Sequence, residues 1–122
     1  MKKGVAWILT NKEGEVLLQK RTANYEKFPS MWTIMGGAME EGETPKEAIN
    51  RELKEELGIK LDLKFCDEFI LHTKVDYTYL FKGKLDNLVK ISLGEGNGIA
   101  FFSKEELKDI KCPDKAIIRK WM

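Results

Sequence analysis

The sequence has few of the residues that mark several common protein classes. Among its 122 residues there are one histidine, two cysteines and three prolines, and 21 basic side chains nearly balance 20 acidic ones. The lone His72, with Cys66 and Cys112 outside any C-x-x-C spacing, argues against the usual kind of zinc site. A formal net charge of +1 gives no global reason to expect a nucleic acid polymer or an anionic membrane as a partner. Any phosphate recognition must therefore be local.

The N-terminal segment also lacks a long hydrophobic run. MKKGVAWILTNKEGE holds two lysines but too few consecutive apolar residues for a signal peptide or a membrane span. We therefore expect a cytoplasmic protein in which both cysteines are reduced. No repeat or low-complexity linker interrupts the chain, so its length predicts a single domain over residues 1–122.

The chain does contain an alternation of strand-forming and helix-forming segments. Residues 4–21 predict a β-hairpin around the turn NKEGE, and WTIM at 32–35 predicts a short buried strand that ends at Gly36 and Gly37. Further strands are expected within 60–75, 76–85 and 98–103, and helices over 45–57, over 104–107 and from about 113 onward. The order β-β-β-α-β-β-β-α-α predicts a mixed α/β sandwich rather than regular βαβ repeats.

The helix expected over 45–57 has the clearest local signals. Thr44 is a favourable N-cap, Pro45 suits the first turn, and Glu47 completes a T-x-x-E capping box. Gly58 is the expected C-terminal cap. The apolar side chains that recur every four residues predict the core-facing stripe: Ile49, Leu53 and Leu57.

The same helix carries acidic side chains that repel one another. Glu52 lies three residues before Glu55 and four before Glu56, and like-charged pairs at these spacings cost a few tenths of a kcal/mol each. At about 100° per residue they lie beside the apolar stripe, with Glu56 expected nearest to it. On helix geometry alone two interpretations stay open: a solvated charged face, in which Arg51 pairs with Glu55, or a cation site.

The segment before the helix favours the cation site. GGAMEEGET places three more glutamates, Glu40, Glu41 and Glu43, after a Gly-Gly pair that lets the backbone approach a ligand closely. Carboxylates are hard oxygen donors, which suit Mg²⁺ or Mn²⁺, and these ions often bridge to substrate phosphates. The sequence therefore predicts a magnesium site near this helix, with Mn²⁺ as a possible substitute.

The segment from Gly37 to Ile59, GAMEEGETPKEAINRELKEELGI, resembles the Nudix box. That box consists of Gly, five residues, Glu, seven residues and then Arg-Glu-aliphatic-x-Glu-Glu-x-Gly-aliphatic. This chain matches every fixed position: Gly37, Glu43, Arg51, Glu52, Leu53, Glu55, Glu56, Gly58 and Ile59. The box covers 23 residues, and the surrounding elements resemble, more weakly, the family's α/β/α sandwich with a mixed sheet. One departure is Met35, where relatives often have a proline before the Gly-Gly pair.

The resemblance implies a chemistry and a set of residues for it. The family's reaction is hydrolysis of a nucleoside diphosphate linked to another group, in which water attacks a pyrophosphate bond while divalent metals offset the charge. Implied metal ligands are the carbonyl of Gly36 and the carboxylates of Glu52, Glu55 and Glu56. Arg51 is implied as a structural residue that pairs with Glu43 or Glu55. The general base stays open between Glu52 and an acid from a later loop.

Four residues outside the helix are expected near the substrate or the metal. Gly37 allows close approach of the backbone. Glu95, in SLGEGNG, matches a place where relatives carry a further metal ligand or base, although a solvent-facing turn carboxylate fits equally. Arg21 matches a phosphate-binding arginine of relatives, although basic residues commonly end strands. Asp114 lies where relatives recognise a purine edge, and its plainer alternative is a helix-start carboxylate.

The box does not determine the substrate. The short chain and the segment CPDKAIIRKW resemble the compact nucleoside-triphosphate members, which release a monophosphate and pyrophosphate; oxidised purine nucleotides are one option. HTKVDYTYLF has no proline, which counts against ADP-ribose. Tyr77 favours dinucleoside polyphosphates, although tyrosine is also a common packing residue in strands. Hydrolysis of another diphosphate, such as a nucleotide sugar, and a non-catalytic nucleotide sensor remain alternatives. We expect a small nucleotide as partner and a monomer or homodimer.

Overall fold

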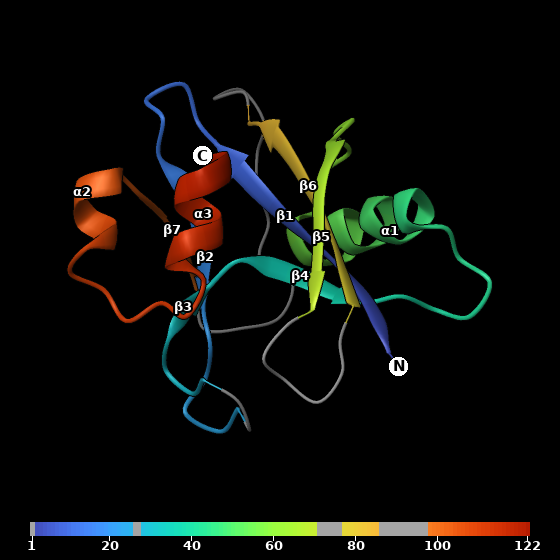
Figure 1. Ribbon diagram of the computed structural model, residues 1–122, viewed down its shortest axis with the longest axis horizontal. Helices are drawn as coiled ribbons and strands as arrows, with labels where there is room; N and C mark the ends of the chain where they lie inside the picture. The colour runs from blue at the N-terminus through green and yellow to red at the C-terminus, as the bar shows by residue number, and fades with distance from the viewer. Residues whose placement is uncertain (1, 26–27, 71–76, 86–97) are drawn as a thin grey trace.

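The computed structural model describes residues 2–25, 28–70, 77–85 and 98–122 (Figure 1). In the described residues, four strands are followed by one long helix, three more strands and two short helices. Their bounds are β1 Lys3–Thr10, β2 Val16–Lys20, β3 Trp32–Thr33, β4 Met35–Ala38, α1 Pro45–Leu57, β5 Lys64–Ile70, β6 Tyr77–Lys84, β7 Ile99–Phe102, α2 Lys104–Leu107 and α3 Lys115–Trp121.

A mixed sheet forms the centre of the molecule, in the order β3-β2-β1-β6-β5. β1 runs parallel to β6 along its whole length and antiparallel to β4 over its first half. The hairpin expected over 4–21 is therefore present only next to its turn, where Thr10 pairs with Val16. The rest of that edge of β1 is occupied by β4, so β2 turns away and pairs with β3 and β7 instead.

The single strand predicted over 32–35 is wrong in its bounds. β3 pairs with β2, whereas β4 continues through Gly36 and Gly37 and pairs with β1. The two strands separate at Ile34, whose N–H donates a hydrogen bond of 3.1 Å to the Asp114 carboxylate. A side chain on Gly36 would place its Cβ only 2.1 Å from a β1 carbonyl oxygen, so the close approach of β4 to β1 requires glycine there.

Helices cover both faces of the sheet, with α1 behind it and α2 and α3 in front in the view of Figure 1. Side chains of β1 alternate between the two layers, as the pleat of a strand requires. The layer under α1 includes Val5, Trp7, Leu9, Ile49, Leu53 and Leu57. The layer under α2 and α3 includes Ala6, Ile8, Leu80, Leu107 and Ile118. The predicted α/β/α sandwich with a mixed sheet is confirmed.

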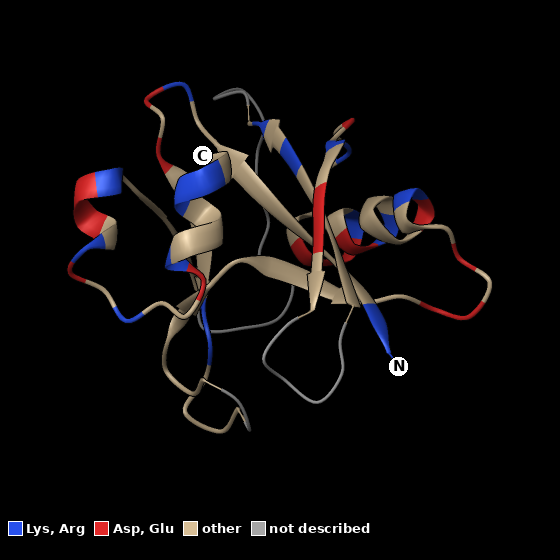
Figure 2. Cartoon of the chain, viewed as in Figure 1, with Lys and Arg blue, Asp and Glu red and all other residues tan. Residues whose placement is uncertain are grey.

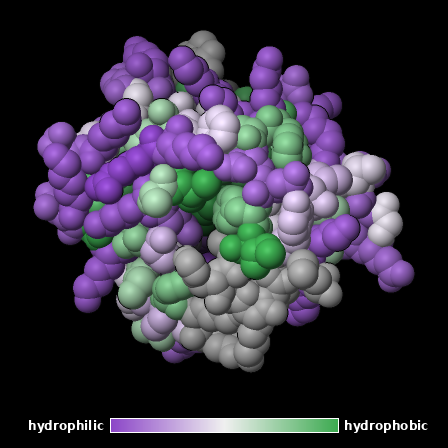
Figure 3. Space-filling view, viewed as in Figure 1, coloured by the Kyte–Doolittle hydropathy of each residue, from purple (hydrophilic) through white to green (hydrophobic). Residues whose placement is uncertain are grey.

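The visible surface is mostly hydrophilic (Figure 3), and the described helices are short. Figure 3 shows hydrophilic side chains over most of the visible face, with apolar ones gathered towards its centre. Across the described ranges, no helix combines the length and apolar character needed to cross a bilayer; the longest, α1, has 13 residues.

Candidate functional site

Local signals at both ends fix the position of α1. The Thr44 hydroxyl accepts from the Glu47 N–H at 3.2 Å, and the Glu47 carboxylate accepts from the Thr44 N–H at 2.9 Å. Gly58 closes the helix in the left-handed conformation, with φ of 67°, and its N–H donates to Lys54. The predicted capping box and glycine cap are therefore confirmed, and they fix the residues at which α1 begins and ends.

Glu52 is the glutamate of α1 that lies closest to the core. Its exposed fraction is 7%, whereas Glu56 is half-buried and Glu55 is exposed, so the expectation that Glu56 lies nearest to the core was wrong. The reason is the facing strand. A Cβ on Gly37 would lie 2.3 to 2.5 Å from the carboxylate atoms of Glu52, so the missing side chain on β4 provides the space that this carboxylate occupies.

Arg51 joins the carboxylates of α1 to the loop before it. Its guanidinium donates to both oxygens of Glu43, at 2.8 and 2.9 Å. It also donates to Glu52 at 2.9 Å, to Glu55 at 3.2 Å and to the carbonyl of Ala38 at 3.0 Å. Arg51 thus contacts both of the carboxylates that the sequence left as alternatives, and it connects the helix, the loop and β4.

The two carboxyl groups next to Arg51 have opposite pKa shifts. The hydrogen bonds from Arg51 and from the backbone N–H of Glu40 lower the pKa of Glu43 to about 2. Burial raises the pKa of Glu52 above its ordinary value, and the hydrogen bond and charge of Arg51 offset only part of that effect. Glu52 therefore retains a buried negative charge that one guanidinium does not fully compensate.

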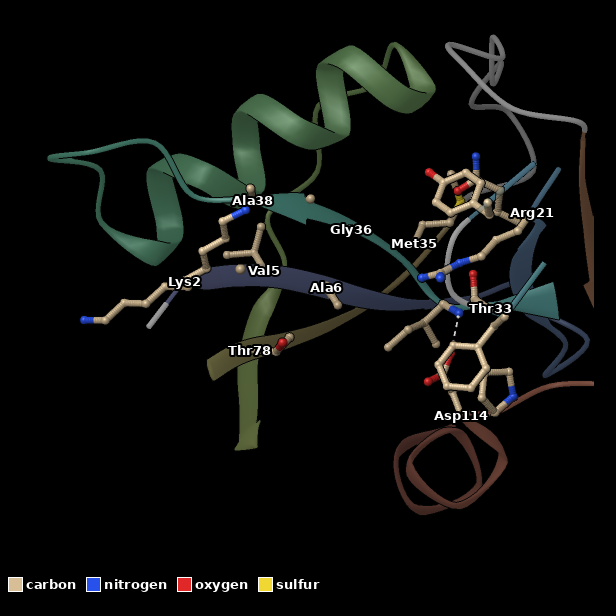
Figure 4. Close-up of a pocket in the computed structure, with 18 residues that line it drawn as sticks. Lys2, Val5, Ala6, Arg21, Thr33, Met35, Gly36, Ala38, Thr78 and Asp114 are labelled. Atoms are coloured by element: carbon tan, nitrogen blue, oxygen red, sulfur yellow. Dashed lines mark hydrogen bonds between the residues drawn. The ribbon is translucent and has the colours of Figure 1, made fainter. Parts of the chain in front are cut away.

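A cavity of about 330 Å³ opens between β1, β4 and the start of α3 (Figure 4). Arg21, Thr33 and Asp114 lie at one end of it, and Lys2 lies at the other. The Arg21 guanidinium lies 4.9 Å from the ring centroid of Tyr25. The cavity therefore combines a cation, a carboxylate and an aromatic wall, which are groups that suit a charged molecule with a planar ring.

The structure brings several predicted site residues together. Arg21, Gly36, Gly37 and Asp114 line the same cavity, and Glu52 contacts Gly37 from the side of α1. In the described part of the chain, no three His, Cys, Asp or Glu side chains converge into a site ready to hold an ion. One oxygen of each of the predicted ligands Glu52 and Glu55 instead accepts a hydrogen bond from Arg51.

Other predicted positions lie elsewhere or remain undescribed. Glu95 lies outside the described residues. Tyr77 lies on β6, where its hydroxyl donates to Glu68 of the neighbouring strand. Sequence reasoning also missed Thr33, a buried residue of β3, and Tyr25 as lining of the cavity. A signal for Tyr25 existed, because an aromatic residue shortly after Arg21 is a natural neighbour for a guanidinium.

Comparisons with known proteins match this chain to Nudix proteins. The family model described as NUDIX domain matches residues 1–122. An uncharacterised Nudix hydrolase of Listeria innocua is 30% identical over 106 residues, which cover 86% of this chain and 59% of that protein. Nucleoside triphosphatase NudI of an Enterobacter species is 39% identical over 71 residues, 53% of this chain and 50% of that protein.

A solved structure extends the likeness over nearly the whole chain. The MutT protein of Methanosarcina mazei superposes with a TM-score of 0.78 at 24% identity, over 98% of this chain and 91% of that one. This similarity shows a shared fold. The chain spans about half to three fifths of the length of the two curated relatives described above.

Proposed function

The chain belongs to the Nudix family, and we propose that it hydrolyses a nucleoside triphosphate to the monophosphate and pyrophosphate with the help of a divalent cation. One observation carries the proposal: the buried carboxylate of Glu52 packs against Gly37, on the wall of the cavity that holds Arg21 and Asp114. The similarity to nucleoside triphosphatase NudI supports this substrate class. The proposed setting is the cytoplasm.

The acidic side of α1 has the chemistry that Mg²⁺ or Mn²⁺ requires. Glu52 carries a buried charge, and Glu55 and Glu56 supply carboxylate oxygens within one turn of it. Carboxylates are preferred ligands of both ions. When bound, the cation would supply charge neutralisation on the phosphates and a more acidic water. We propose these three glutamates as its ligands, with the Gly36 carbonyl and Glu95 as further candidates.

The remaining residues have roles that follow from their contacts. Arg21 lies at the cavity wall, where its guanidinium suits a phosphate chain. Arg51 holds Glu43 and Glu52 in one arrangement. The raised pKa of Glu52 moves this carboxylate towards the range in which it accepts a proton from water, so we propose it as the general base.

A product panel tests this function. The protein is incubated with Mg²⁺ and, separately, nucleoside triphosphates, a dinucleoside polyphosphate, a nucleotide sugar and ADP-ribose, and products are separated by chromatography. We expect monophosphate and pyrophosphate from one or more triphosphates. Glu56→Gln should lower kcat by about a hundredfold or more, because the charge stabilisation by a metal is worth several kcal/mol.

The matched control is Glu41→Gln, an exposed carboxylate of the loop before α1. It removes the same charge nearby, and we expect its kcat to stay close to that of the wild type. Unchanged hydrolysis in Glu56→Gln would refute the metal role. Cleavage confined to the other diphosphates would refute the substrate class.

A further inference from the structure

A second cavity, of about 570 Å³, lies at the other end of α3. Asp114, directly before α3, lines the first cavity, whereas Trp121, its last residue, lines the second. Four lysines and one aspartate also line it: Lys12, Lys64, Lys82, Lys84 and Asp62. We call this space the lysine cavity. None of the residues discussed above as part of the hydrolytic site lines it.

The sheet register forces the lysines of this cavity close together. Lys64 of β5 and Lys82 of β6 are direct partners across the two antiparallel strands, and Lys84 follows two residues later on the same face. The Lys82 ammonium lies 5.2 Å from the ring centroid of Trp121, so this face is the one that α3 covers. Like charges directly opposite each other destabilise a sheet.

Nearby carboxylates relieve this repulsion only in part: the hydrogen bond and charge of Lys46 are the main causes of the lowered pKa of Asp62, and the charge of Lys64 contributes less. Asp62 pairs with Lys46 at 2.7 Å, outside the cluster. Asp67 accepts from the Trp121 indole N–H at 3.1 Å and pairs with Lys120 at 3.5 Å. Among the residues that the structure describes, no carboxylate forms an ion pair with Lys12, Lys64, Lys82 or Lys84. Among the described residues that line the cavity, four lysines thus stand against one aspartate, in a chain whose formal net charge is only +1.

The basic groups are arranged around a hollow. They come from the turn after β1, from β5 and from β6, and Figure 2 shows these segments at the same end of the molecule as the C-terminal end of α3. Trp121 and Ile8 supply a firm apolar wall, and Thr10 and Asn11 supply uncharged polar groups. A ligand with several linked anionic groups could contact more than one of these ammonium groups at once.

We propose that the lysine cavity binds an oligophosphate chain, either free or as the tail of a nucleotide. Because the ammonium groups belong to two strands and a turn, a chain of linked phosphates matches them better than a single carboxylate or phosphate. Binding there needs neither a divalent cation nor hydrolysis. If this cavity does not bind phosphates, the proposed hydrolysis is unaffected. If the proposed hydrolysis is wrong, the proposed binding in the lysine cavity is likewise unaffected.

Calorimetry with inorganic tripolyphosphate in chelator-containing buffer tests the proposal on the full chain. Lys82→Gln/Lys84→Gln should weaken binding about tenfold or more, which corresponds to about 1.4 kcal/mol. Lys104→Gln/Lys111→Gln removes the same charge from exposed positions outside the cavity and should change binding less than about twofold. Arg21→Gln should retain the Lys82-dependent binding, since Arg21 lines the other cavity.

Two further measurements complete the test. Lys64→Gln, on the facing strand, should weaken binding as well, and thermal melts should show that none of these variants loses its fold. A non-hydrolysable nucleoside triphosphate distinguishes the source: equal affinity supports recognition of the phosphate chain alone, and tighter binding supports a nucleotide. Equal losses in the two double variants, or binding abolished by Arg21→Gln alone, would overturn the proposal.

Discussion

At the scale of single residues, the contact between Gly37 and Glu52 explains why a charged side chain is tolerated at the edge of the core. β4 provides no side chain at this position, and the carboxylate fills the space. Arg51 then supplies the nearest positive charge, at 2.9 Å. The buried carboxylate thus packs against Gly37 on one side and accepts a hydrogen bond from Arg51 on the other.

Gly37→Ala should destabilise the protein because the new methyl group would overlap the Glu52 carboxylate. Overpacking of this kind costs about 1–3 kcal/mol. The free energy of unfolding by urea measures the effect. The same substitution in a Glu52→Ala background should cost much less, because the opposing atoms are gone. An equal cost in both backgrounds would show that the backbone of β4, and not Glu52, requires the glycine.

Glu52→Gln should become more stable relative to the wild type as pH rises. The pKa of Glu52 is raised in the folded protein above its ordinary value of 4.5. The folded state therefore binds the proton more tightly, and wild-type stability falls as pH rises through the interval above 4.5. Gln is neutral throughout, so the difference in melting temperature between Glu52→Gln and wild type should grow between about pH 4 and 7.

Glu43→Gln gives the opposite sign and serves as the control. The pKa of Glu43 in the folded protein is about 2, below its ordinary value of 4.5. Ionised Glu43 therefore stabilises the folded state fully above pH 4.5, and this stabilisation is lost as pH falls towards 2. Glu43→Gln should therefore melt increasingly below the wild type as pH rises from 2 to 5. Parallel pH profiles for all three proteins would contradict both shifts.

Predictions about single residues succeeded where spacing along the chain determines which side chains are in contact. The positions of Glu43, Arg51 and Glu55 in the Nudix box placed them within reach of one another, and the structure shows their hydrogen bonds. The relative burial of Glu52 and Glu56 was not accessible in this way. It depends on which strand faces the helix, and a helix pattern alone contains no information about that strand.

At the scale of elements, Asp114 connects the start of α3 to the break between β3 and β4. Its carboxylate accepts from the N–H of Ile34, 80 residues earlier in the chain, and it also lines the first cavity. This side chain makes no hydrogen bond that caps α3, although it lies directly before the helix, where a carboxylate is favoured by the helix dipole. One side chain thus fixes a strand and borders the proposed nucleotide site.

Asp114→Asn separates these two roles. The amide oxygen can still accept from Ile34, so the melting temperature should change little, whereas its nitrogen presents donors where the carboxylate presents acceptors. A base with adjacent donors, such as guanine, should lose affinity, and KM for guanine nucleotides should rise about tenfold relative to pyrimidine nucleotides. Steady-state kinetics with both classes measures this. Equal changes in KM for both would exclude base recognition by Asp114.

The boundaries of α1 could be predicted, but the pairing of the strands could not. Thr44, Glu47 and Gly58 act through contacts within a few residues, and these contacts are visible in the sequence. The strand through Gly36 and Gly37 was missed because glycine weakens strands, and only the tertiary contact with β1 favours it there. The parallel pairing of β1 with β6 joins segments far apart in sequence, so no local signal marks it.

At the scale of the whole molecule, the sheet separates two kinds of surface. α1 lies on one face with its carboxylates, and α3 lies on the other between the two cavities. β4 connects α1 with the first cavity, since Gly37 contacts Glu52 and also lines that cavity. Glu52, one of the proposed cation ligands, thereby lies next to the wall of the proposed nucleotide cavity.

The central claim is that the carboxylates of α1 form a divalent cation site, and Mn²⁺ binding followed by electron paramagnetic resonance tests it most directly. Loss of the free Mn²⁺ signal should show binding by the wild type. Glu56→Gln should bind at least about tenfold more weakly, and Glu41→Gln should match the wild type within about twofold. Undiminished binding by Glu56→Gln, or an equal loss in both variants, would contradict the claim.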